Sequence, residues 1–420
     1  MTTKTITVDY LARVEGETAI EVRVPGDPSK VVRLRIFEPP RFFEGFLVGR
    51  RYDEVGDIVA RICGICPVSH MLTAIRALEK AMGVEPSEQT ILLRRIAALS
   101  QVAASHLVHL YMLAMPDYMG FDGAAEMLPF FPDRMQRLVR MRKVFNDLTA
   151  VVAGGRALHP IGTVVGGFTR LPVRGELLAI RERLLQIRAD ARETVKMVAD
   201  FETPTLKGDR EYVALQSADS YAINQGRLTS NKGLDASEDD YYNCFEEQQV
   251  DYAMAKKVTV RRRGGLVVGA LARLNLKYNA LFPSVRDLAR TVGFRLPDEN
   301  PFHNNLAQSL EVVQAIEECV EMLGRIELRQ EEPRVTVRPG EGKAVTEAPR
   351  GLLHHWYVIN RKGVVEKANI ITPTAHNFVN IESDLHRLVL SMADQPLDAI
   401  RKACEMLVRA YDPCFSCSVH

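Results

Sequence analysis

Two pairs of cysteines, one near each end of the chain, constrain this sequence more than any other feature. Cys63 and Cys66 lie in RICGICPVSH, and Cys414 and Cys417 lie in DPCFSCSVH, the last residues of the 420-residue sequence. Two residues between cysteines let both sulfurs reach one metal ion from a tight turn, and four thiolates suffice for a soft-metal site. If the pairs share a site, the fold must bring the two ends of the chain together.

The separation of the two pairs indicates what kind of site this is. A structural zinc module usually takes its four ligands from one short stretch, because the metal has to fold a small element. Here most of the chain separates the pairs, which favours a site assembled by the whole fold. The spacing alone is also compatible with a structural zinc site or a disulfide that links the two ends. The other cysteines, Cys244, Cys319 and Cys404, are predicted to be small buried apolar side chains.

Charge and hydropathy exclude several classes of protein. The sequence has 54 basic and 53 acidic residues without a strongly charged block, which argues against nucleic acid and a polybasic membrane anchor as ligands. No apolar run reaches the roughly 18–20 residues of a membrane span, and the N-terminus lacks the apolar core of a signal peptide. We therefore expect a cytoplasmic protein without a membrane span. With no spare cysteine set and no G-x-G-x-x-G fingerprint, it is not expected to hold an iron–sulfur cluster or a nicotinamide itself.

Periodicity predicts an α+β fold that is mainly α. Apolar residues alternate with charged ones before and after PGDPS, over 20–24 and 32–36, which predicts a β-hairpin. We expect one domain over residues 1–420, in which residues 1–45 form a small sheet packed on a helical core. Residues 217–242 are predicted to be a surface excursion, with a short strand at 335–337. Helices are predicted over 87–113, with Ser87 as N-cap and Pro116 as the stop, and over 133–153, 175–202, 304–330 and 383–410.

The cysteine segments resemble the large, catalytic subunit of nickel–iron hydrogenases. RICGICPVSH fits that family's motif R-x-C-G-x-C-x-x-x-H, and DPCFSCSVH fits D-P-C-x-x-C-x-x-H, in the same order and at opposite ends. The resemblance covers essentially the full length and implies that family's fold, a large helical bundle with a small N-terminal sheet and short peripheral strands. It continues in ARVEGE at 12–17, PRFFEGFLVGR at 40–50, SHLVHLYML at 105–113, EAPRGLLHHW at 347–356 and ITPTAHN at 371–377.

The resemblance implies a heterometallic centre held by the four cysteines. All four would bind nickel, and Cys66 and Cys417 would also bridge to an iron that carries carbonyl and cyanide ligands, whereas Cys63 and Cys414 would bind nickel alone. Thiolates suit this role because they are soft and stabilise a nickel that changes oxidation state. A terminal thiolate can also take a proton, so Cys414 is expected to be the first proton acceptor when H2 is cleaved heterolytically.

Other matched positions imply roles around this centre. Glu15, in RVEGE, matches the glutamate that relays the proton outward, although on the residues alone it is a surface-strand glutamate. Arg350, in APRG, matches the arginine over the open nickel–iron position, where it would act electrostatically and by position. Asp412 matches the carboxylate that pairs with this arginine. Pro349 and Thr374 match residues around the diatomic ligands, with Thr374 as a hydroxyl donor to cyanide.

A second metal is implied near the C-terminus. Glu44, His420 and the backbone carbonyl of Ile370 match the ligands of a magnesium ion, or an iron, that anchors the tail. His70 follows Cys66 by one helical turn, where its ring N–H would support a thiolate, and a buried core histidine is an equally good interpretation without the motif. Ser105 stands where many membrane-bound members have an aspartate, which favours the cytoplasmic branch.

Within the family, the sequence most resembles the alpha subunits of cytoplasmic, NADP-linked hydrogenases, also called sulfhydrogenases. This implies four partners: H2, a small iron–sulfur subunit, a flavin subunit that binds NAD(P), and a further iron–sulfur subunit. Sulfur reduction is a further activity of that branch. The NAD-linked bidirectional type is the alternative enzyme, and a four-cysteine zinc scaffold is the non-enzyme alternative. A related respiratory-complex subunit that lost its cysteines is disfavoured, because all four are present.

Overall fold

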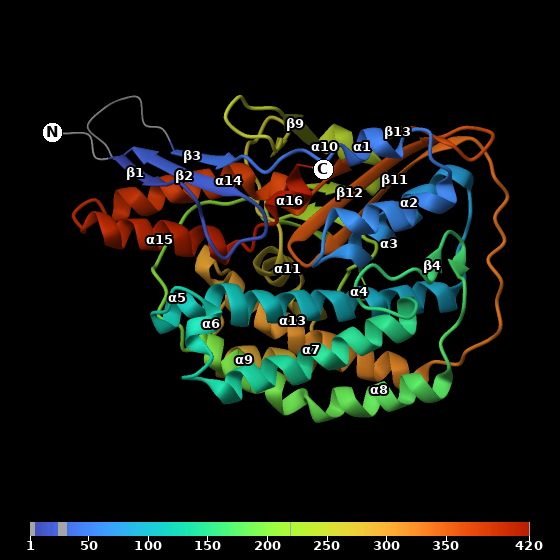
Figure 1. Ribbon diagram of the computed structural model, residues 1–420, viewed down its shortest axis with the longest axis horizontal. Coiled ribbons are helices and arrows are strands. Elements are labelled where there is room, and N and C mark those ends of the chain that lie inside the picture. Colours follow the sequence, from blue (N-terminus) through green and yellow to red (C-terminus); the bar gives the residue numbers. More distant parts are fainter. Residues whose placement is uncertain (1–4, 24–31, 219, 420) are drawn as a thin grey trace.

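Long helices form one side of the molecule (Figure 1). The computed structural model describes residues 5–23, 32–218 and 220–419. Helix α13 packs against α4, α8 and α9, and most of its side chains are buried, as expected for a helix at the centre of a bundle. The long helices of this layer are α4 (Glu88–Val108), α7 (Pro132–Ala153), α8 (Arg174–Gln186), α9 (Arg188–Ala199) and α13 (Asn304–Arg325).

Two three-stranded antiparallel sheets and three helices form the other side (Figure 1). The N-terminal sheet contains the expected hairpin, and Val24 lies outside the described residues. The mainly α fold with a small N-terminal sheet is confirmed. The elements of this layer are β1 (Thr5–Val8), β2 (Thr18–Arg23), β3 (Val32–Ile36), β11 (Gly340–Ala348), β12 (Gly351–Ile359), β13 (Val365–Ile371), α3 (Pro67–Met82), α14 (Pro373–Ser391) and α15 (Leu397–Ala410).

The remaining elements are shorter. The short helices are α1 (Phe43–Leu47), α2 (Tyr52–Val59), α5 (Met115–Met119), α6 (Ala124–Met127), α10 (Tyr241–Cys244), α11 (Ala270–Lys277), α12 (Pro283–Thr291) and α16 (Phe415–Ser418). The remaining strands are β4 (Thr163–Val164), β5 (Gly167–Phe168), β6 (Val213–Gln216), β7 (Arg227–Ser230), β8 (Asp235–Ala236), β9 (Phe245–Gln248) and β10 (Lys257–Val260).

Helix α3 lies directly on the backbone of β11. A Cβ atom at Gly342 would come 2.0 Å from the carbonyl oxygen of Ala77, and one at Gly340 would come 2.1 Å from that of Ala81. Only glycine permits such an approach. The contact places α3, whose N-terminus follows Cys66, against the strand that leads to Arg350.

Several predicted helices have different bounds in the structure. Ser87 is the N-cap of α4, because its Oγ accepts a hydrogen bond from the backbone N–H of Thr90. The helix does not end at Pro116, as predicted, but continues through a π-helical segment, His109–Ala114, into α5. Pro116 stands in the first turn of α5, where a backbone N–H is not needed. The predicted helix over 133–153 is α7.

Two other predicted helices are each broken in two. The segment 175–202 forms α8 and α9, which meet at Ile187, and the segment 383–410 lies in α14 and α15, which are separated by a turn ending in Pro396. Proline disfavours a helical conformation in the residue before it, so the second break has a local cause.

Two loop predictions were also wrong. Residues 335–337 form no strand, because the pairing with β12 begins at Gly340. The segment 217–242 is not a surface excursion, since β7 and β8 pair beside β6, and Tyr221 and Leu228 are buried. In the described part of the chain, one helical stretch, Glu88–Met119, is long and apolar enough to cross a membrane, and most of it is buried inside the protein.

Candidate metal centre

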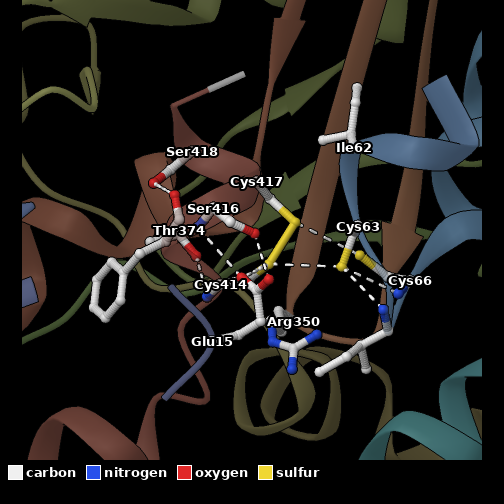
Figure 2. The surroundings of a disulfide bond; sticks show 12 residues. Glu15, Ile62, Cys63, Cys66, Arg350, Thr374, Cys414, Ser416, Cys417 and Ser418 are labelled. Carbon is white, nitrogen blue, oxygen red and sulfur yellow. Dashed lines mark hydrogen bonds between the residues drawn. A yellow bond between two sulfur atoms is a disulfide. The ribbon is translucent and has the colours of Figure 1, made fainter. Parts of the chain in front are cut away.

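The two cysteine pairs meet in the interior. The four Sγ atoms lie within 4.8 Å of one another, and each cysteine is at least 95% buried. The sulfurs of Cys63 and Cys414 are 3.7 Å apart, and those of Cys66 and Cys417 are 3.9 Å apart. Figure 2 shows the sulfurs side by side, supplied by the segment before α3 and by α16. The sequence-based expectation that the two ends of the chain converge is therefore correct.

The first pair lies in a loop whose backbone faces a sulfur. Cys63 follows a single 3-10 turn, Ala60–Ile62, and Cys66 is the N-cap of α3. The backbone N–H groups of Ile65 and Cys66 point at Sγ of Cys63, at 3.3 and 3.2 Å. Such donors stabilise negative charge on sulfur, as does the positive end of the α3 dipole.

The two thiols of this first pair differ in acidity. A hydrogen bond from the Cys66 thiol lowers the pKa of Cys63 more than burial raises it, and the charge of Arg350 lowers it further. The same hydrogen bond, together with burial, raises the pKa of Cys66 well above its ordinary value. Cys63 is therefore the first sulfur of this pair to become a thiolate.

The second pair forms a disulfide in the structure, which the sequence analysis did not assign to these two residues. Cys414 and Cys417 are joined (Figure 2), with their Cα atoms 5.5 Å apart, a common separation for bonded cysteines. The physical reason is local: Cys414 caps α16 and Cys417 lies in its first turn, so both sulfurs point to one side. Metal ligation requires the same two residues as thiolates, so a metal centre here needs this pair in its reduced form.

Glu15 lies against the second pair. Its Oε2 is 2.8 Å from Sγ of Cys414 and accepts a hydrogen bond from the backbone N–H of Ser416, at 3.2 Å. Its other carboxylate oxygen accepts a hydrogen bond from the Ser416 hydroxyl. Its backbone carbonyl accepts a further bond, of 2.7 Å, from the N–H of Phe415. Glu15 is therefore held in direct contact with a cysteine sulfur and is not an isolated surface glutamate.

Arg350 lies beside the sulfurs (Figure 2) and is 4% exposed. Its Nε donates to Oδ1 of Asp412, at 3.1 Å, and Nη1 makes a long contact of 3.5 Å with the hydroxyl of Ser105. Its Nη2 is 2.9 Å from the same Asp412 oxygen but is not aligned to donate to it, and it has no hydrogen-bond partner among the described residues. A buried donor without a partner is costly, so this nitrogen is suited to an acceptor bound at the centre.

Three further predicted residues, Thr374, Pro349 and His70, have hydrogen-bond partners in the structure. The hydroxyl oxygen of Thr374 accepts a hydrogen bond of 2.8 Å from the backbone N–H of Cys414, so it positions that ligand. The carbonyl oxygen of Pro349 accepts a bond from Arg273. Nδ1 of His70 is 3.2 Å from Nε2 of His355, so one ring nitrogen of His70 is engaged by the sheet beneath α3.

The expected second-metal residues are partly within the described chain. Oε1 of Glu44 accepts a hydrogen bond of 2.8 Å from the backbone N–H of Ile370, so these two expected ligands are adjacent. His420 lies outside the described residues. Val419, just before it, accepts a hydrogen bond of 3.1 Å from the backbone N–H of Arg41, which ties the end of the chain to the segment before α1.

Sequence reasoning missed two residues that hold the centre together. Nη2 of Arg41 donates both to the carbonyl of Ile62, at 2.5 Å, and to that of Ser416, at 2.7 Å, so one side chain bridges the two cysteine segments. Ser416 itself holds Glu15. Arg41 lies in the family-like segment PRFFEGFLVGR, but only the tertiary structure brings it to the residues that it bridges, Ile62 and Ser416.

The donor set fits a soft heterometallic centre. Four sulfurs close together, with backbone donors on one of them, suit a soft metal such as nickel, and the carboxylate beside the Cys414 sulfur can accept a proton. An unpartnered guanidinium nitrogen adds a donor for an anionic ligand. A structural zinc site would need neither the carboxylate nor the arginine.

Comparisons with known proteins agree with this chemistry. The family described as nickel-dependent hydrogenase matches residues 41–130 and 247–420, which include all four cysteines. The chain is 33% identical to the sulfhydrogenase 1 subunit alpha of Pyrococcus furiosus, over 99% of this chain and 97% of that protein. It is 28% identical to the NAD-reducing hydrogenase HoxS subunit beta of Cupriavidus necator, over 99% of this chain and 94% of that protein.

A solved structure shows the same architecture. The crystal structure of an NAD+-reducing [NiFe]-hydrogenase in the H2-reduced state superposes with a TM-score of 0.86, at 26% identity and with complete coverage of both chains. The likeness thus extends to the segments outside the family match, including the one that carries Glu15. This chain belongs to the nickel-dependent hydrogenase family, whose members are oxidoreductases that act on H2, and it is the catalytic large subunit of a nickel–iron hydrogenase.

Proposed function

We propose that this chain cleaves H2 reversibly and heterolytically within a cytoplasmic complex that reduces NADP, and that residues 1–420 act as one catalytic domain. The chain would pass two electrons to a small iron–sulfur subunit, from which they would reach a flavin subunit and a further iron–sulfur subunit. The likeness to sulfhydrogenase and NAD-reducing subunits supports this assignment. The 2.8 Å contact between Cys414 and Glu15 is the observation that carries it.

The four cysteines, as thiolates, would hold the nickel, and Cys66 and Cys417 would be shared with an iron carrying carbonyl and cyanide ligands. When bound, this centre supplies the redox chemistry that polarises H2 and takes up its electrons. The Cys414 sulfur would accept the first proton. Glu15 would take that proton across 2.8 Å and pass it outward, with Ser416 keeping the carboxylate in place.

Arg350 would act by charge and position. An arginine stays protonated, and its unpartnered Nη2 provides a donor for a cyanide on the iron. Thr374 has its oxygen engaged by the Cys414 N–H, which leaves its hydroxyl hydrogen for a second cyanide. Pro349 would lie beside the diatomic ligands, and His70 would support a thiolate. Magnesium, or iron, would bind Glu44, the Ile370 carbonyl and His420.

The electron partner is expected at the first cysteine loop. Gly64 is exposed and Ile65 is half-buried, although Cys63 and Cys66 on either side are buried. This loop is therefore a short path from the sulfurs to the surface. Reduction assays on the complex with NADP and with NAD would separate the proposed branch from the NAD-linked alternative.

Glu15→Gln tests the proposed proton route. This variant keeps the shape of the side chain and one acceptor oxygen for the backbone N–H of Ser416 but removes its ability to carry a proton, so we expect nickel and iron to be retained and H2 turnover to be lost. Glu17→Gln is the matched control, because Glu17 is exposed on the same segment and should keep full activity. Loss of nickel from Glu15→Gln would instead assign Glu15 a structural role, and retained turnover would refute the route.

A further inference from the structure

We propose that Arg273 is a positioning residue that fixes Arg350 at the metal centre by holding the backbone of the turn that carries it. The placement itself is a property of the fold, and its effect on catalysis rests on the function proposed above. Arg273 lies in α11, outside all the motifs that carry the family resemblance.

Every donor of the Arg273 side chain is used. The residue has no exposed surface, and a guanidinium has five N–H donors in a fixed plane. Nε and Nη2 donate to the two carboxylate oxygens of Glu311, at 2.6 and 2.7 Å, and Nη1 donates to Glu347 at 3.0 Å. The two remaining donors reach the carbonyl oxygens of Ala348, at 3.1 Å, and Pro349, at 2.9 Å.

Those two carbonyls belong to the turn that presents Arg350. Ala348 ends β11 and pairs with Gly351 at the start of β12, so Pro349 and Arg350 form the whole connection. The turn packs closely on the start of α11: a Cβ atom at Gly351 would lie 2.4 Å from Cγ2 of Val268. Arg273, which lies in α11, therefore binds the same turn that packs against the residues just before this helix.

The charges around Arg273 balance in the interior. Glu311 and Glu347 face Arg273 and Lys277, whose Nζ is 3.8 Å from Oε1 of Glu347. Burial alone would raise the pKa of Glu311, but the charge and hydrogen bonds of Arg273 and His106 hold it below its ordinary value. Burial lowers the pKa of Lys277 to about 8. A lysine at 273 could keep this balance but could not reach all five acceptors.

The same cluster also reaches the helix that carries Ser105, a second residue in contact with Arg350. Nε2 of His106 is 2.8 Å from Oε2 of Glu311, and His106 directly follows Ser105, whose hydroxyl faces Nη1 of Arg350. The Arg273–Glu311 pair thus joins the turn to α4. The Arg273–Glu311 ion pair therefore supports both the backbone turn that carries Arg350 and the helix that carries Ser105.

Arg273→Lys tests the proposal, with Arg94→Lys as the matched control. Arg94 is equally buried and binds both oxygens of Glu79, at 2.7 and 2.9 Å, but its hydrogen bonds do not involve the turn. Two readouts are taken on the purified complex: hydrogen–deuterium exchange of the backbone amides in residues 345–353, and the infrared bands of metal-bound carbonyl and cyanide. The ratio of kcat to KM for H2 is measured beside them.

We expect Arg273→Lys to speed exchange in the turn about tenfold, the equivalent of one or two lost hydrogen bonds, and to shift the infrared bands. Arg94→Lys should lose stability without either change. If Arg273→Lys does not fold, the double variant Arg273→Met/Glu311→Leu replaces the pair by apolar side chains, a change that is often tolerated, and it should give the same two changes.

Unchanged exchange and unchanged bands in a folded Arg273 variant would overturn the proposal, because Arg273 would then only balance charge. If the parent complex shows no carbonyl or cyanide bands, the proposed function fails, whereas faster exchange in the turn would still support the placement of Arg350 by Arg273. The two failures are thus distinguishable.

Discussion

Replacing Asp412 with asparagine should destabilise the protein by about 3 kcal/mol, the range found when one partner of a buried ion pair is removed. Asp412 is 1% exposed and accepts hydrogen bonds from Nε of Arg350, at 3.1 Å, and from Nε2 of Gln308, at 2.9 Å. Asn keeps the size of the side chain and tolerates the left-handed backbone at this position, where φ is 50°. The change therefore removes the charge and one acceptor oxygen without altering the size or the backbone of the residue.

The loss comes from two effects that the structure makes specific. The Arg350 charge would have no carboxylate in hydrogen-bond contact, and the amide NH2 of the new asparagine would face a donor whichever way it turned. In its present orientation Gln308 offers this NH2 no acceptor, because its own Nε2 is the group that donates to Asp412. A buried donor left without an acceptor costs about 1–3 kcal/mol, which agrees with the total.

Urea unfolding followed by fluorescence measures this change, because Trp356 is the only tryptophan of the chain and lies on β12, just after Arg350. Asp398→Asn is the control: its side chain is 90% exposed and pairs with Arg401 at the surface, so it should stay within about 0.5 kcal/mol of the parent. If Asp412→Asn also stays within that range, the Arg350–Asp412 pair does not stabilise the fold and the reasoning is wrong.

Two further predictions concern the segment at the start of α14. Burial lowers the pKa of His376 to about 4; its Nδ1–H donates to the carbonyl of Thr372, and its Nε2 accepts from the Tyr241 hydroxyl. Histidine in the unfolded chain takes up a proton near pH 6.5. The contribution of His376 to the free energy of unfolding, about 3 kcal/mol, is therefore complete above pH 6.5 and is lost as the pH falls to 4. His376→Gln should remove that much of the acid dependence of the urea midpoint, and an unchanged slope would contradict it. Thr374→Val should lower the free energy of unfolding by about 1–3 kcal/mol in the same assay, because the backbone N–H of Cys414 loses its buried acceptor. An unchanged free energy of unfolding would show that this N–H has another acceptor in the variant.

The chemistry of the centre could be predicted because it depends on residue types and their local spacing. Cysteines two residues apart must present their sulfurs together, wherever the rest of the chain goes. Glu15, Arg350 and Thr374 could be assigned only through the ordered motifs around them, and the structure places all three beside the sulfurs. Their chemical roles stay proposals that the variants above test.

Helix bounds were less predictable where tertiary packing overrode a local signal. Pro116 stops a helix in isolation, yet the π-helical turn before it lets the helix continue into α5. Residues 175–202 have one unbroken apolar period, yet the chain bends at Ile187 so that both α8 and α9 pack on α13.

The sequence by itself determined which atoms can bind the metals, because ligand chemistry belongs to the side chain, and it led us to expect that the two ends of the chain meet if both pairs share one site. Only the tertiary structure decided how Arg350 is held there. Arg273 has the sequence signature of a charged helix residue, and nothing in its neighbours along the chain predicts five buried acceptors. Those acceptors come from Glu311, Glu347 and the turn after β11, and a charge is stable in the interior only where the whole fold brings its partners together.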